Sequence, residues 1–185
     1  MTNEADTSLP PRLVPDRPFP PYAYLPGRYP HPVRDPRGHS YGKEPETPEP
    51  PDPQRWRACN AYLYGIDLFN HGFYWEAHEA WEGLWNACGR HGSAAAFFQG
   101  LIAIAAAGLK VRVGNVQGVT GHARRATDLF DLAARELGSG GARYMGLDVR
   151  ALGRWASGIA ERPPAPRGNE GDARAVVFDL VLRPK

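Results

Sequence analysis

The distribution of proline constrains this fold more than any other feature of the sequence. Of the 19 prolines, four follow residue 160 and the others precede residue 54, so the stretch from 54 to 162 has none. Because proline removes a backbone donor and clashes inside a helix, long regular helices are confined to that stretch. We therefore expect an arm over residues 1–52, a helical bundle over 53–162 and a C-terminal tail over 163–185.

The arm is rich in ring side chains, whereas disordered linkers are usually poor in aromatic residues. Its tyrosines and histidines between positions 20 and 42 are Tyr22, Tyr24, Tyr29, Tyr41, His31 and His39. The prolines lower the entropy cost of fixing such a segment. We predict an extended, ordered arm that wraps the bundle, with KEPETPEPP at 43–51 as a looser linker.

Apolar spacing and capping residues predict about five helices in the proline-free stretch. The expected ranges are 53–71, 73–88, 94–113, 116–137 and 149–162. The residues that favour helix starts are Asp52 with Pro53, Ser93, Asn115 and Asp148. The sequence GSGG from Gly138 predicts a break, and the tail sequence AVVFDLVL predicts one extended segment that docks on the bundle or on another subunit.

The expected fold class is all-α, a compact antiparallel bundle of about five helices. Short loops make consecutive helices antiparallel neighbours. The apolar run from Ala94 to Leu109 is shorter than the roughly 20 residues that a membrane span needs, so we interpret it as a buried central helix. Cys59 and Cys88 lie in apolar helical patterns, which favours buried thiols over a disulfide or a metal site.

Charge divides the bundle into two halves. Between Ala58 and Gly89 there is no lysine or arginine, and the acidic residues there are Asp67, Glu76, Glu79 and Glu82. From Gly83 to Thr127 there is no carboxylate, and the basic residues are Arg90, Lys110, Arg112, Arg124 and Arg125. The two halves are complementary in sign.

The second helix places His78, Glu79 and Glu82 on one face, and like charges at this spacing repel by roughly 0.2–0.5 kcal/mol even when exposed. A metal ion, the cations of the following helices, bound protons or tyrosines of the arm could compensate. A structural alternative is a buried salt-bridge network that fixes the register of the second to fourth helices. The expected ligand pocket is lined by Asn70, Trp75, Glu76, His78, Glu79, Glu82, Gln99, Lys110, His31, His39 and Tyr41.

A divalent metal site is one specific interpretation of this face. His78 and Glu82 lie one turn apart, with Glu79 or Glu76 as a further ligand or as a general base, so Glu76 and Glu79 are the catalytic candidates. Imidazole with carboxylates suits zinc, iron or manganese. The pattern His-Glu-x-x-Glu lacks the second histidine of zinc proteases, and no Glu-x-x-His pair of di-iron bundles occurs.

A longer pattern resembles the Domain of Unknown Function 309 family. The residues that carry it are Asn70, Gly72, Tyr74, Trp75, Glu76, Ala77, His78, Glu79, Glu82 and Trp85, then Gln99 to Ile102, Gly114 and Asn115. The resemblance covers about residues 60–137, and Trp81 and Gly83 depart from it. It implies an all-α bundle and no activity, because the family is itself uncharacterised.

Two hypotheses for function follow, and they leave open whether the protein is an enzyme. The first is a module that binds a small ligand or a protein partner in a buried Glu/His pocket on the second helix. The alternative is a metal-dependent hydrolase that uses His78, Glu79 and Glu82. Nucleic-acid binding through Arg112, Arg124 and Arg125 is disfavoured, because the net charge is only +2.

The N-terminal sequence has neither a basic start nor an apolar run, so we expect a cytoplasmic protein with no membrane association. A homo-oligomer is compatible with the docking tail.

Overall fold

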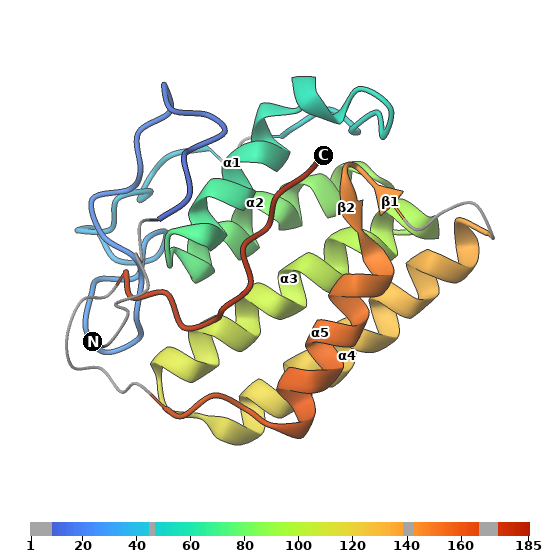
Figure 1. The fold of residues 1–185 in the computed structure, drawn as a ribbon. Coiled ribbons are helices and arrows are strands. Elements are labelled where there is room, and N and C mark those ends of the chain that lie inside the picture. Colours follow the sequence, from blue (N-terminus) through green and yellow to red (C-terminus); the bar gives the residue numbers. More distant parts are fainter. Residues whose placement is uncertain (1–8, 45–46, 139–142, 167–173) are drawn as a thin grey trace, which may run out of the picture.

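The described part of the chain forms a bundle of five α-helices with one short 3-10 helix and one two-stranded hairpin (Figure 1). The computed structural model describes residues 9–44, 47–138, 143–166 and 174–185. The elements are η1 (Trp56–Ala58), α1 (Asn60–Asn70), α2 (Tyr74–Ala87), α3 (Gly92–Arg112), α4 (Val116–Glu136), β1 (Arg143–Tyr144), β2 (Leu147–Asp148) and α5 (Val149–Glu161). The expected all-α class is confirmed.

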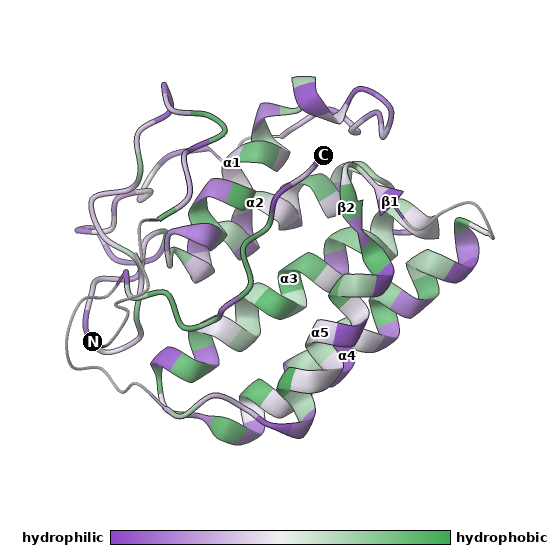
Figure 2. Ribbon diagram, viewed as in Figure 1, coloured by the Kyte–Doolittle hydropathy of each residue, from purple (hydrophilic) through white to green (hydrophobic). Residues whose placement is uncertain are grey.

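Each helix packs against the next one along the chain, and α3 lies between α2 and α4. At 21 residues α3 is longer than its apolar run indicated, and by length and composition alone it could span a membrane. However, 67% of its apolar window is buried inside the protein, which accounts for the hydrophobicity. Figure 2 shows the contrast between the mostly apolar α3 and the banded, amphipathic α4.

Two glycines allow the neighbouring helices to approach α3 closely. A Cβ at Gly108 would lie 2.6 Å from the Tyr74 ring, and one at Gly100 would lie 2.6 Å from the Phe130 ring. Both rings are buried. Tyr74 of α2 and Phe130 of α4 therefore pack directly against the backbone of the central helix.

Two predicted helix starts are wrong: Asp52 with Pro53 for the first helix, and Ser93 for the third. Asp52 accepts hydrogen bonds from the Gln54 amide at 2.9 Å and from Arg55 Nε at 2.8 Å, but this turn leads only into η1. Regular α-helix begins only after Cys59, because the ψ angle of 84° at this residue is not helical. Helix α3 begins at Gly92, before Ser93, and its N-cap residue His91 makes no side-chain cap.

The two other predicted caps are confirmed. Asn115 Oδ1 accepts from the Gly118 amide at 2.8 Å, and Asp148 Oδ1 accepts from the Ala151 amide at 2.9 Å. A hairpin that was not predicted from the sequence precedes α5, and in it Tyr144 pairs with Leu147 around Met145 and Gly146. Both turn residues have positive φ, 47° and 81°, as the tight hairpin turn requires. The predicted GSGG break and linker 43–51 include residues outside the described ranges.

The N-terminal arm packs against α1 and α2 (Figure 1). Asp67 of α1 is 1% exposed and accepts the backbone amides of Leu13 at 2.7 Å and Val14 at 2.9 Å. Tyr64 donates from its hydroxyl to the Pro18 carbonyl at 2.9 Å. Leu25 of the arm is fully buried in the core. The arm is thus held by polar anchors as well as by apolar contacts.

The C-terminal tail runs as an extended segment across the bundle, in contact with α1 and α2, and ends beside the hairpin (Figure 1). The Asn70 side chain holds both backbone groups of Leu182, its Nδ2 donating to the carbonyl and its Oδ1 accepting from the amide, each at 2.9 Å. The Tyr74 hydroxyl accepts the Val177 amide at 3.0 Å. The described part of the tail therefore docks on its own bundle.

The two cysteines are free and half-buried. Burial raises the pKa of both the Cys59 and the Cys88 thiol above the ordinary value, which keeps them protonated at neutral pH.

Candidate metal centre

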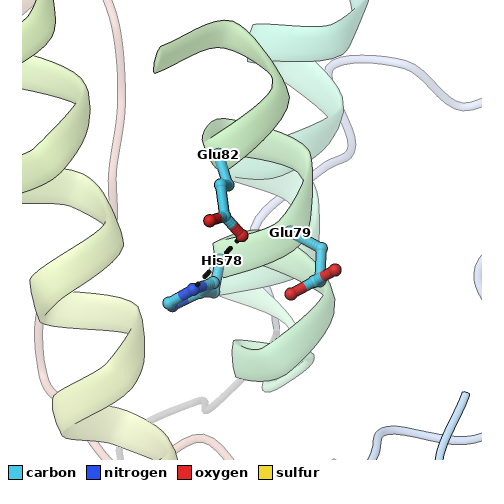
Figure 3. Close-up of side chains that lie close together, drawn as sticks. All are labelled: His78, Glu79 and Glu82. Carbon is cyan, nitrogen blue, oxygen red and sulfur yellow. Dashed lines mark ion pairs between the residues drawn. The ribbon is translucent and has the colours of Figure 1, made fainter. Parts of the chain in front are cut away.

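Helix α2 brings His78, Glu79 and Glu82 together at the surface of the bundle (Figure 3). One ligand atom from each residue lies within 4.8 Å of the other two. His78 Nε2 lies 3.8 Å from Glu82 Oε2, as expected for side chains one turn apart. A single cation could contact all three residues.

The electrostatics of the cluster suit a cation. Desolvation, together with the charges of Glu82 and then Glu76, raises the pKa of Glu79 to about 7. Burial also lowers the pKa of His78, with Glu82 acting in the opposite direction. At neutral pH His78 is therefore mainly the neutral imidazole, which is the form that binds metal ions.

The cluster is less buried than the sequence analysis expected. The side chain of His78 is 33% exposed, that of Glu82 is 44% exposed, and Glu79 is also exposed. The face of α2 that enters the core carries instead Ala77, Trp81 and Leu84. His78, Glu79 and Glu82 are therefore not buried, because they lie beside the core-facing stripe, whereas Glu76 is buried.

Glu76 lies apart from the cluster and contacts the arm. It is 6% exposed, and its Oε1 accepts the Tyr24 amide at 2.8 Å. His39 Nε2 lies 3.5 Å from the same oxygen. Glu76 is therefore covered by the arm in this conformation, and the other catalytic candidate, Glu79, is the one that solvent reaches.

Of the two other arm residues that were expected in the pocket, His31 and Tyr41, only His31 lies beside Trp75, together with Tyr24. The ring of His31 lies 5.5 Å from that of Trp75, and the ring of Tyr24 lies 5.4 Å from it, measured between centroids. Tyr41 is 51% exposed and lies outside this ring cluster. The arm therefore covers the start of α2 and leaves the His78–Glu82 pair open.

The cations of α3 do not neutralise the acidic face. Within the described part of the chain, Glu79 and Glu82 form no ion pair with a lysine or arginine, and neither does Lys110 with a carboxylate. The aliphatic stem of Lys110 lies against Gly118 of α4 instead. Among the described residues, Glu79 and Glu82 thus take no part in the salt-bridge network that was considered for the second to fourth helices.

The remaining polar residues of the expected pocket are Asn70 and Gln99. Asn70 binds the tail, as described above. Gln99 is half-buried on α3. Asp67, which was noted only as part of the acidic half, is the main polar anchor of the arm. The sequence signal for this role was that Asp67 is the charged residue in the otherwise mostly apolar sequence of α1.

The arginines considered for nucleic-acid binding do not share one surface. Arg112 is 1% exposed, whereas Arg124 and Arg125 are exposed on α4. Burial lowers the pKa of His122, near these residues, and the charges of Lys110, His78 and Arg125 lower it further.

The fold and the cluster define the class: an all-α bundle with one histidine and two glutamates converging on its second helix. Residues 62–121 match the family model described as Domain of unknown function (DUF309), which confirms the family resemblance of the sequence. The matched range contains the whole cluster. No curated protein matches the chain.

Proposed function

We propose that this protein binds a divalent transition-metal ion through His78, Glu79 and Glu82. The observation that carries the proposal is the convergence of three ligand atoms within 4.8 Å of one another. An imidazole with two carboxylates is a donor set that suits zinc, manganese or iron. A bound cation would also relieve the repulsion between the two glutamates, which no protein cation relieves among the described residues.

Because the cluster is exposed, water or a ligand can reach an ion bound there. Three protein ligands leave coordination positions of the ion open to water or to a ligand. The proposed module would therefore bind a small ligand or a partner through the metal, and the buried pocket expected from the sequence is not needed.

Metal titration of the purified, chelator-treated protein tests the proposal. Calorimetry with Zn²⁺ and Mn²⁺ should show one site per chain, and Glu82→Gln or His78→Ala should weaken it at least tenfold. The matched controls are Glu136→Gln and His91→Ala, which change the same residue types at exposed positions away from the cluster. Equal affinity in site and control variants would refute the site, as would the absence of a saturable signal.

A metal-dependent hydrolase is the narrower candidate, favoured by the position of Glu79. This carboxylate is exposed beside the His78–Glu82 pair, where it can act as a general base on metal-bound water. Glu79→Gln separates the two roles. If Glu79 is the base, the variant keeps metal affinity and loses hydrolysis of chromogenic ester and phosphoester substrates. If the metal-loaded wild type hydrolyses none of them faster than the Glu82→Gln variant, the binding role alone stands.

A further inference from the structure

A second polar site lies far along the chain from the α2 cluster, in a cleft between α4 and α5. The cleft has a volume of about 350 Å³, at the lower end of the range for small-molecule sites. Its lining residues are Asp131, Ala134 and Arg135 of α4 with Arg150 and Arg154 of α5. The two helices are neighbours in the bundle, connected through the hairpin (Figure 1).

Three arginines from two helices converge on this cleft. Arg150 and Arg154 lie one turn apart on α5, and Arg135 faces them from the last turn of α4. All three are exposed, and none of their guanidinium groups makes a hydrogen bond or an ion pair with another described residue. Like charges one turn apart on a helix destabilise it by roughly 0.2–0.5 kcal/mol, so this arrangement favours a bound anion.

The cleft is also lined by one carboxylate, that of Asp131, and the net charge of the lining residues remains positive. Asp131 Oδ1 would lie 3.3 Å from a Cβ at Gly153, so this carboxylate packs against the backbone of α5. Three guanidinium groups and one carboxylate give the lining a formal charge of +2. A phosphate monoester carries a charge of about −1.5 to −2 at neutral pH, which matches that value.

We propose that the α4–α5 cleft binds the phosphoryl group of a small molecule. The planar guanidinium group donates two parallel hydrogen bonds to phosphate oxygens, and arginines from two helices can hold such a group from both sides. A nucleic acid fits less well, because its footprint is a basic stripe. Here the exposed acids Asp128 and Glu136 interrupt the series of basic residues along α4.

Titration of metal-free protein with inorganic pyrophosphate at constant ionic strength tests this site. The wild type should show saturable binding by calorimetry and a rise in melting temperature. The Arg150→Gln/Arg154→Gln variant should bind at least tenfold more weakly. The matched control is Arg124→Gln/Arg125→Gln, which removes the same charge from exposed positions of α4 outside the cleft and should bind within twofold of wild type.

Three results would overturn the proposal. Non-saturable binding would show that no site exists, and equal weakening in the two double variants would show that only the net charge matters. Single-stranded RNA that binds more tightly than pyrophosphate, with a steep salt dependence, would assign the surface to nucleic acid. Circular dichroism checks that the variants fold, and Arg135→Gln, on the other helix, must reproduce the loss even if the double variant unfolds.

Discussion

Replacement of Asp67 by alanine should release the N-terminal arm. Asp67 of α1 is 1% exposed and accepts the amides of Leu13 and Val14 at 2.7 and 2.9 Å. Arg12 Nε lies 3.6 Å from the same carboxylate. Each hydrogen bond to a charged acceptor contributes roughly 1.5–3 kcal/mol, so the two together contribute at most about 3–6 kcal/mol.

The net loss should be smaller than this sum, because the freed amides of the arm return to water once the arm detaches. We expect Asp67→Ala to lower the free energy of unfolding by about 2–4 kcal/mol. The loss is smallest if the remaining apolar contacts keep the arm on the bundle. Phe19, which stacks on Phe73 with centroids 4.8 Å apart, is one of those contacts. Detachment should also expose the arm to protease.

Urea unfolding measures the stability, and limited trypsin digestion measures the release. Cleavage after Arg12, which precedes Leu13, should become much faster in the variant, since that guanidinium lies 4.0 Å over the Phe19 ring and its Nε lies 3.6 Å from Asp67 in the docked arm. Asp128→Ala, at an exposed position of α4, is the control and should change stability by less than about 0.5 kcal/mol. If Asp67→Ala unfolds like this control and its cleavage rate is unchanged, the anchoring role is refuted.

Two further substitutions test the core and the cluster. Gly108→Ala should lower the free energy of unfolding, measured in urea, by about 1–2 kcal/mol. The clash with Tyr74 outweighs the gain of up to about 1 kcal/mol in helix propensity. A stabilised variant would contradict the close packing. The pKa of Glu79 is raised to about 7, so its contribution to stability is present below its ordinary pKa and is lost as pH rises towards 7. Glu79→Gln should therefore stabilise the metal-free protein more at pH 8 than at pH 5. The difference should be about 1 kcal/mol or less, because solvent screens the exposed group. An identical effect of the substitution at both pH values would contradict this.

Local sequence patterns predicted most of the helices because helix formation is governed by nearby residues. The caps at Asn115 and Asp148 lie where the sequence placed them, since each cap is a bond between residues three apart. The start of α1 was wrong because the Asp52 turn satisfies the same local rules as a helix start. The hairpin was missed because its paired strands are two residues each, too short for an alternating pattern.

The candidate site was predictable in part. The spacing of His78, Glu79 and Glu82 placed them on one face of α2, and the structure brings their ligand atoms together. Their burial could not be predicted, because it depends on which face of α2 enters the core and on how far the arm reaches. The cations of the basic half were one of the possible ways to neutralise the cluster, but the Lys110 side chain lies against Gly118.

The sequence by itself determined an all-α bundle, because a proline-free stretch with apolar periodicity has few other ways to bury its hydrophobic residues. It also determined the one-turn spacing of His78 and Glu82. Only the tertiary structure decided which carboxylates stay free. Asp67 and Glu76 accept backbone amides from the arm more than 50 positions away, while Glu79 and Glu82 remain at the surface. Contacts between such distant residues follow from the packing of the whole chain, which no local pattern encodes.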